Sequence, residues 1–173
     1  MSRRVMILLC LLWAGSAQAN WGVARQVLEQ PAVVGQARLT VLLFKVYDAT
    51  LYAPKGRYQA NQPFVLTLRY LREFKGEKIA QRTVEEMRKQ GFMNEAKLAS
   101  WLRTMNALFP DVQPGVELSA VRLPSGATDF YQGEQPIGQV QDPEFGKQFF
   151  AIWLGEKTSE PVMRRQLLKL ASQ

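Results

Sequence analysis

The spacing of apolar residues changes along this chain from the period of a strand to the period of a helix. Residues 64–72 alternate, so that one face of the predicted strand carries Phe64, Leu66, Leu68 and Tyr70. Residues 76–90 instead carry apolar side chains at helical spacing, and a second helical stretch follows Asn94 and stops at Pro110. Strands and helices are therefore grouped along the chain, which favours an α+β fold over a βαβ winding.

The segments on either side extend this grouping. Asp142 followed by Pro143 is typical of a helix start, and Ser159 with Pro161 repeats the signal. The remaining predicted elements are one or two strands over 37–53, a hairpin of 117–123 and 128–132, a short strand at 138–140, a helix over 143–154 and a last helix after Pro161. The sequence thus predicts a large, mostly antiparallel sheet with helices.

The first nineteen residues have the three parts of a secretory signal peptide. Arg3 and Arg4 are basic, residues 5–14 are apolar, and residues 17–19 form a small-x-small cleavage site. An apolar run of this length is too short to cross the roughly 30 Å hydrocarbon core of a bilayer. We therefore expect a signal peptide over 1–19 with cleavage after Ala19, one domain over 20–173, no transmembrane segment in the mature protein, and a periplasmic location.

Composition excludes several kinds of chemistry. The chain has no histidine, and its one cysteine, Cys10, lies in the predicted signal peptide. A Ser-His-Asp triad, a Cys-His pair and a His-bearing zinc site are therefore excluded. The carboxylates, Glu86 among them, show no metal-ligand spacing and are expected at the surface, so we expect no metal and no cofactor. The mixed charges of residues 75–89 indicate a solvated helix face with ion pairs rather than a nucleic-acid contact.

Arginine and tyrosine remain as candidate binding groups. Residues 38–52 alternate polar with large apolar side chains, and both faces of this stretch are expected to be at least half buried. A buried Arg38 needs a partner, and an anionic ligand is one candidate because arginine binds carboxylates through two hydrogen bonds. The alternative is an arginine in a structural salt bridge, with tyrosine hydroxyls at the rim. The aromatic residues Phe145, Phe149, Phe150 and Trp153 likewise fit either a ligand pocket or core packing.

Three quoted segments together resemble a known family. Residues 44–54 (FKVYDATLYAP), 66–70 (LTLRY) and 149–155 (FFAIWLG) are similar to the bacterial exported branch of the chalcone isomerase family, as are 109–112 (FPDV) with 114–115 (PG). The resemblance spans nearly all of residues 20–173. It implies an open-faced β-sandwich, in which a large antiparallel sheet packs against a helical layer.

The resemblance also locates the residues that the plant enzymes use to cyclise chalcones. The family's strand arginine matches Arg38, its strand threonine falls on Tyr47, and its helix-opening tyrosine falls near Lys75. Its helical asparagine falls on Arg82, and its late threonine or serine falls on Ile152. At most one of the five residue types is kept, so chalcone cyclisation is not expected.

Noncatalytic relatives in this family hold fatty acids. The resemblance therefore implies a protein that binds a small amphipathic anion, with Arg38 as the carboxylate partner and Tyr47 as a hydrogen-bond donor. One alternative is an isomerase or intramolecular lyase that acts on an enone or chalcone-like substrate, with Lys45 or Lys75 as the base. Another is an envelope interaction protein whose cleft is filled by its own side chains. The cavity distinguishes these hypotheses: an apolar pocket that reaches Arg38 supports binding, whereas a filled core supports the interaction protein.

The last predicted helix raises the question of a membrane partner. Its basic residues Arg164, Arg165 and Lys169 permit a weak contact with anionic lipid, whereas its apolar residues fit docking into the protein core.

Overall fold

The fold is a single antiparallel sheet whose strands follow one another in chain order. The computed structural model describes residues 21–171, so the predicted signal peptide lies outside the described residues. The six strands pair in the order β1-β2-β3-β4-β5-β6, each antiparallel to the next. Their bounds are β1 Pro31–Val41, β2 Phe44–Pro54, β3 Phe64–Tyr70, β4 Glu117–Arg122, β5 Thr128–Gln132 and β6 Gln135–Val140. The predicted α+β class and antiparallel sheet are confirmed.

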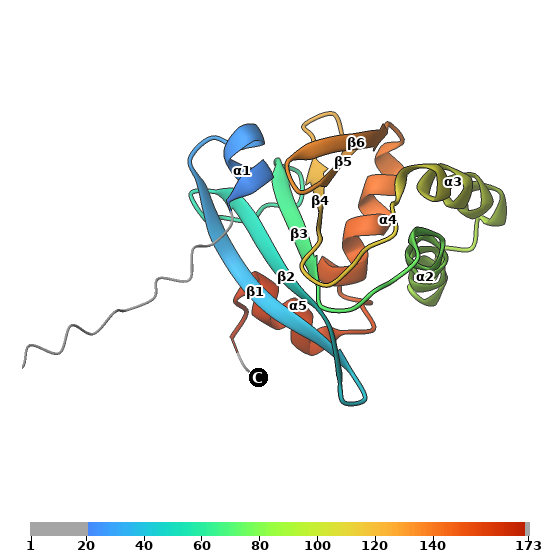
Figure 1. Ribbon diagram of the computed structural model, residues 1–173. Helices are drawn as coiled ribbons and strands as arrows, with labels where there is room; N and C mark the ends of the chain where they lie inside the picture. The colour runs from blue at the N-terminus through green and yellow to red at the C-terminus, as the bar shows by residue number, and fades with distance from the viewer. Residues whose placement is uncertain (1–20, 172–173) are drawn as a thin grey trace, which may run out of the picture.

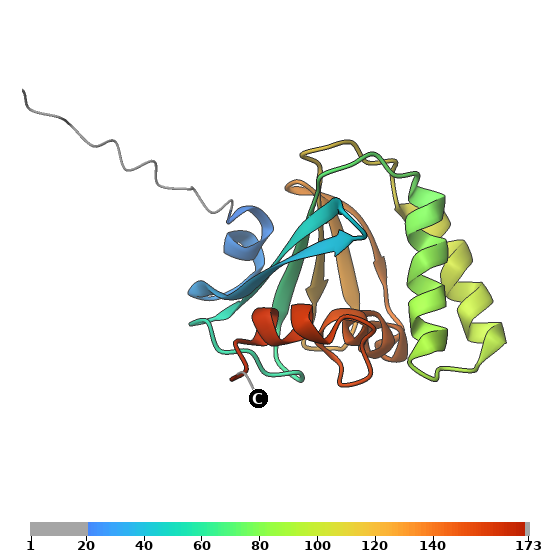
Figure 2. The same cartoon turned by 90° about the horizontal axis from the view of Figure 1, so that it is seen from below.

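Helices cover the two faces of the sheet unequally. Their bounds are α1 Gly22–Val27, α2 Gly76–Lys89, α3 Glu95–Leu108, α4 Pro143–Leu154 and α5 Pro161–Leu168. The main core contains Leu66 of β3, whereas its neighbour Val65 packs with α1 in a separate cluster on the opposite face. Figures 1 and 2 show α2 and α3 as a pair beside the sheet, and α4 packs against α2 and β5. The larger helical layer therefore encloses the inner face of the sheet.

Local signals set the starts of α3 and α4. The side chain of Asn94 accepts a hydrogen bond from the backbone N–H of Lys97 at 3.1 Å, and that of Asp142 accepts one from Glu144 at 2.9 Å. Both bonds satisfy backbone groups that a helix start leaves free, as the sequence predicted. Ser159 behaves differently, because α5 begins after Glu160 and the Ser159 hydroxyl instead donates to Glu86 Oε2 at 2.7 Å.

The last helix packs into the core. Met163 and Leu167 of α5 are buried, and Arg164 Nε donates to the carbonyl oxygen of Leu154 at 2.9 Å. A Cβ atom on Gly35 of β1 would lie 2.3 Å from the carbonyl oxygen of Gln166, so only glycine permits this close approach. The apolar side of α5 thus faces the protein. None of the helices in the part of the chain that the structure describes is long and apolar enough to span a membrane.

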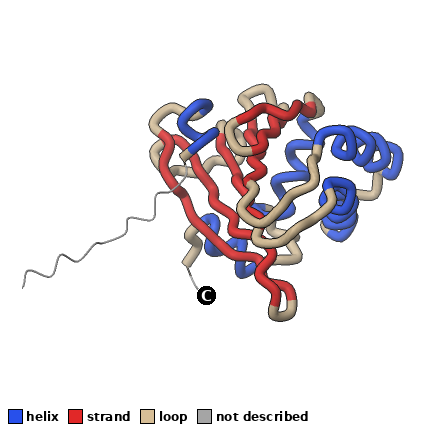
Figure 3. The backbone as a smooth tube through the Cα atoms, in the orientation of Figure 1, coloured by secondary structure: helices blue, strands red, loops and turns tan. Residues whose placement is uncertain are grey.

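Three features of the fold were not predicted. No helix was predicted for the α1 segment, and β1 begins at Pro31 rather than near the predicted residue 37. The stretch 37–53 is two strands, which is one of the two predicted arrangements, but the tight turn at Leu42 and Leu43 that joins them and projects from the molecule was not located (Figure 3). Because the turn carries no Gly, Asn or Pro, its sequence gave no turn signal. The expectation that both faces of residues 38–52 are half buried is wrong near the turn in the middle of the stretch, where Phe44 and Lys45 are exposed.

Candidate functional site

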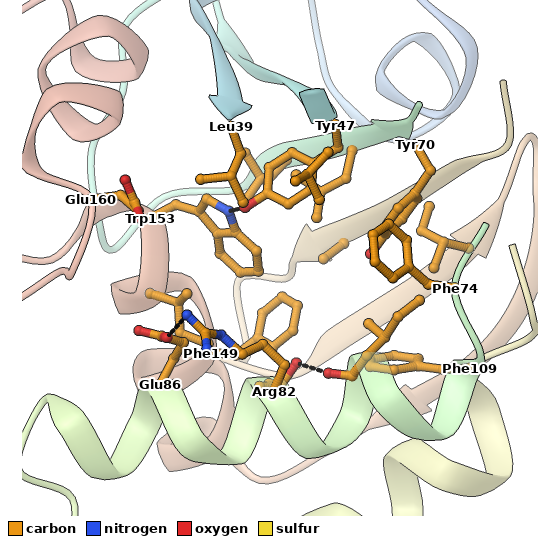
Figure 4. Close-up of a pocket in the computed structure, with 18 of the residues that line it drawn as sticks. Leu39, Tyr47, Tyr70, Phe74, Arg82, Glu86, Phe109, Phe149, Trp153 and Glu160 are labelled. Atoms are coloured by element: carbon orange, nitrogen blue, oxygen red, sulfur yellow. Dashed lines mark hydrogen bonds and ion pairs between the residues drawn. The ribbon is translucent and has the colours of Figure 1, made fainter. Parts of the chain in front are cut away.

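An apolar cavity lies between the inner face of the sheet and helices α2 and α4. Its volume is about 390 Å³, within the roughly 300–1,000 Å³ range of small-molecule pockets. The sheet lines it with Leu39, Tyr47, Leu66, Leu68, Tyr70, Leu118, Ala120 and Phe130 among others, and the helices line it with Lys78, Ile79, Arg82, Thr83, Glu86, Phe149, Ile152 and Trp153. In Figure 4, Tyr47 and Trp153 lie on one side of the cavity, while Arg82 and Glu86 lie on the other.

Aromatic side chains form much of the wall. Phe149 of α4 packs edge-on against Phe130 of β5, with ring centroids 5.3 Å apart, and lies beside Trp153 at the same centroid distance. Phe145 stacks behind Phe149 and is fully buried. The four aromatic residues therefore divide between the two predicted roles, pocket lining and core packing. Phe149 and Trp153 line the cavity, whereas Phe145 and Phe150 pack in the core.

Tyr47 is fixed by a hydrogen bond from α4. The indole Nε1–H of Trp153 donates to the Tyr47 hydroxyl oxygen at 2.9 Å. Burial raises the pKa of Tyr47 to about 12, and the nearby carboxylates Glu160 and Glu86 act in the same direction. The phenol therefore keeps its proton at neutral pH and is able to donate it to a ligand.

Tyr70 presents a second hydroxyl to the cavity. Its ring lies 5.9 Å from that of Tyr47, edge to face, and only 4% of the residue is exposed. Burial raises the pKa of Tyr70 above its ordinary value. None of the hydrogen bonds within residues 21–171 uses its hydroxyl, and the oxygen is not among their fully buried unpaired atoms, so it opens onto the cavity. A ligand or water that entered the cavity would supply the missing bond.

A buried carboxylate borders the cavity on α2. Glu86 Oε1 accepts from Arg82 at 2.6 Å and from Lys89 at 3.0 Å, while Oε2 accepts from Ser159. Burial alone would raise the pKa of Glu86, but the hydrogen bonds from Ser159 and Lys89 and the charge of Arg82 together lower it. The expectation of a surface position for Glu86 is wrong, because the Ser159 segment covers this side of α2.

Arg82 combines cavity contact with exposure. Its side chain is 60% exposed, and its second ion pair, with Glu85, is long at 3.9 Å. Since a guanidinium has five N–H donors, these two contacts leave donors for an anion at the rim of the cavity.

Three of the five predicted site residues meet at this cavity, namely Tyr47, Arg82 and Ile152. Arg38 does not. It projects from the other face of the sheet, where its guanidinium forms two hydrogen bonds with Asp48, at 2.5 and 2.9 Å. The structure therefore corrects the assignment of Arg38 as carboxylate partner and favours the structural salt bridge that the sequence left open.

Lys75 also lies away from the cavity lining. Its ammonium group binds Asp111 Oδ2 at 2.7 Å, and Asp111 Oδ1 accepts from the backbone N–H of Gly76 at 3.0 Å. Lys75 thus helps to fix the start of α2. Because the salt bridge and the exposed position both favour the charged ammonium, Lys75 is a poor general base.

Sequence reasoning missed two groups of this site. Tyr70 shares the strand face of Leu66 and Leu68, so the predicted alternation already pointed it to the core. Glu86 carries no such signal, because its burial depends on a segment more than seventy residues away. Within the described residues no cluster of three or more Asp, Glu, His and Cys is arranged to hold a metal ion.

Comparisons with known proteins agree with this architecture. The sequence profile of a family described as chalcone isomerase-like matches residues 34–169. An uncharacterized protein of Haemophilus influenzae is 29% identical over 136 residues, which make up 78% of this chain and 66% of that relative. The crystal structure of a fatty-acid binding protein of Arabidopsis thaliana is similar in fold, with a TM-score of 0.62 and 12% identity; the match covers 81% of this chain and 87% of that one.

Proposed function

Because the chain belongs to the chalcone isomerase-like family, we propose that it binds a small amphipathic anion, such as a fatty acid, and does not convert it. The observation that carries the proposal is the apolar cavity with Arg82 at its rim. The plant protein of similar fold is described as fatty-acid binding, which supports the same class of ligand.

The cavity offers separate places for the two ends of such a ligand. Its apolar part would lie among the aromatic and aliphatic side chains of β3, β4 and α4. Its carboxylate would lie at the rim against Arg82, whose pairing with Glu86 uses one nitrogen. Tyr47 would donate to a polar group closer to the sheet. Glu86 keeps its Lys89 and Ser159 bonds while Arg82 turns to the ligand.

The isomerase alternative loses both of the bases considered for it. Lys45 and Lys75, the two lysines considered for that role, do not line the cavity. The raised pKa values of Tyr47 and Tyr70 keep both phenols protonated near neutral pH. Glu86 is ionised, but both of its oxygens accept hydrogen bonds. These features support binding over proton abstraction.

The open volume between the sheet and the helices argues against the other alternative, an interaction protein whose cleft is filled by its own side chains. We place the binding function in the periplasm, on the strength of the basic, apolar and small-residue pattern of residues 3–19. The N-terminal mass of the exported protein tests this: a chain that begins at Asn20 supports it, and an intact Met1 retained in the cytoplasm contradicts it.

The ligand proposal is tested by displacement of a fluorescent fatty acid. Arg82→Gln should weaken binding at least tenfold, because a charge-assisted hydrogen bond is lost. Arg82→Lys should retain part of the affinity, since it keeps the charge without the planar donor pair. Arg38→Gln is the matched control and should bind as the unmodified chain does, because its salt bridge lies outside the cavity.

Native mass spectrometry of the purified protein identifies what the cavity carries. An acidic lipid in the spectrum that is lost in Arg82→Gln supports the proposal. Equal affinity of the Arg82→Gln and Arg38→Gln variants for the fatty acid, with both variants folded, would overturn it.

A further inference from the structure

The turn between β1 and β2 exposes four consecutive apolar residues. The exposed fractions are 50% for Val41, 88% for Leu42, 92% for Leu43 and 55% for Phe44. Single exposed apolar residues are common on protein surfaces, but four in a row at the tip of a projecting hairpin indicate an interaction surface (Figure 3).

Folding alone does not account for these residues. Val41 pairs with Phe44, so Leu42 and Leu43 form a two-residue turn, and Leu42 has φ of +56°. Glycine or asparagine adopts this conformation with less strain, and tight hairpins favour them for that reason. The turn therefore carries leucine where hairpin formation favours a polar or small residue, as happens at functional sites.

Basic side chains flank the apolar turn. Lys45 is exposed beside Phe44, and the guanidinium of Arg72 lies 4.6 Å from the centroid of the Phe44 ring. The nearby acidic groups are Glu73 and Asp48, and the charge of Asp48 is paired with Arg38. Apolar residues beside cations match a bilayer with anionic headgroups, whereas two copies of this positively charged tip would repel each other.

The same hairpin borders the cavity. Leu39 and Val41 of β1 and Val46 of β2 all line it, so the apolar surface continues from the exposed turn to the cavity wall. A bilayer that held the turn would therefore lie beside this side of the cavity.

We propose that the Val41–Phe44 turn inserts into the surface of an anionic lipid bilayer, with Lys45 and Arg72 at the headgroups. The surface differs from that of the basic residues of α5, where Met163 and Leu167 are buried in the core. If the binding function proposed above holds, insertion of the turn would give the cavity access to membrane lipid. Insertion itself does not depend on that function.

Vesicle binding tests the proposal with the protein as purified, its N-terminus defined by mass. The double variant Leu42→Gly, Leu43→Asn places suitable turn residues at the tip, so it should fold at least as stably as the parent. We expect it to bind vesicles of phosphatidylcholine with phosphatidylglycerol at least tenfold more weakly. Arg72→Gln and Lys45→Gln should each weaken binding about fivefold. Met93→Ser, which removes an exposed apolar side chain from the loop between α2 and α3, should have no effect.

A local probe separates insertion of the turn from contacts elsewhere. In a Cys10→Ser background, Leu43→Cys is labelled with an environment-sensitive fluorophore, and Met93→Cys serves as the matched control. Anionic vesicles should shift the emission of the label at residue 43 to shorter wavelength and leave that at residue 93 unchanged. No shift at residue 43, or equal shifts at both sites, would overturn the proposal. So would sedimentation that shows a dimer formed through the turn, in a protein that fails to bind vesicles.

Discussion

The indole N–H of Trp153 donates a hydrogen bond to the hydroxyl oxygen of Tyr47 across the cavity wall. The bond joins α4 to β2, two elements separated by more than a hundred residues in the chain. It uses an acceptor position of the phenol and leaves the phenolic proton free for another partner. Tyr47 therefore stabilises the packing of α4 on the sheet and also contributes a polar group to the cavity.

Removal of each of the two cavity hydroxyls should have a different consequence for the free energy of unfolding. Tyr47→Phe leaves the indole N–H of Trp153 without its partner and should lower the free energy of unfolding by about 1–2 kcal/mol. Tyr70→Phe removes a hydroxyl that has no protein partner, and should leave stability unchanged or slightly raised. Urea unfolding of ligand-free protein measures both changes. Equal losses in the two variants would contradict the assignment of the hydrogen bond.

Alkaline titration should reveal the buried phenol of Tyr47. Its pKa is about 12 in the folded protein against 10.0 in the ordinary state. A raised pKa contributes stability that is fully present below pH 10 and is lost as the pH rises towards 12. Tyr47 alone should therefore account for a loss on the order of 2 kcal/mol over this range.

The measurement is the free energy of unfolding at several pH values, with tyrosinate absorbance followed in parallel. Tyr47→Phe should show a shallower decline than the parent. Tyr131→Phe, a change at a more exposed tyrosine outside the cavity, serves as the control and should decline much as the parent does.

The starts of α3 and α4 were predictable because their signals are local. Asn94 and Asp142 each bond to a backbone group two or three residues away, so the residue types alone indicated these starts. The turn at Leu42 and Leu43 was not predictable, because neither residue has the conformational preference that the turn requires.

The pairing partner of Arg38 in the sheet depends on one irregularity in strand pairing. Val41 pairs with Phe44 and Thr40 with Lys45, but a bulge then shifts the register so that Arg38 lies opposite Asp48. An unbroken register would have placed Arg38 opposite Tyr47 instead. Because a single extra residue exchanges the partners of every later position, a sequence without a visible bulge signal cannot decide between a salt bridge and a ligand contact for Arg38.

The buried carboxylate of Glu86 should make the protein sensitive to acid. Its pKa is lowered in the folded state, so its contribution to stability is present above its ordinary value of 4.5 and is lost as the pH falls below it. Glu86→Gln should reduce the difference in unfolding free energy between pH 7 and pH 3. Glu85→Gln, which changes an exposed carboxylate one position away on α2, is the matched control. A pH dependence in Glu86→Gln that equals the parent's would contradict this role.

The depth of the cavity should set the length of the ligand it accepts. Ala120 of β4 lines the cavity, so Ala120→Leu would extend three carbon atoms into it. Each ligand methylene that loses its buried place costs about 0.8 kcal/mol, so affinity for the longest bound fatty acid should fall by about 2 kcal/mol while shorter ones keep theirs. Stability should not fall, because the new side chain fills open volume rather than a packed core. Ala96→Leu, on an exposed position of α3, controls for the added bulk. The measurements are displacement assays over a series of alkanoates and urea unfolding of each variant. A destabilised Ala120→Leu protein with an unchanged chain-length preference would mean that the ligand does not occupy this part of the cavity.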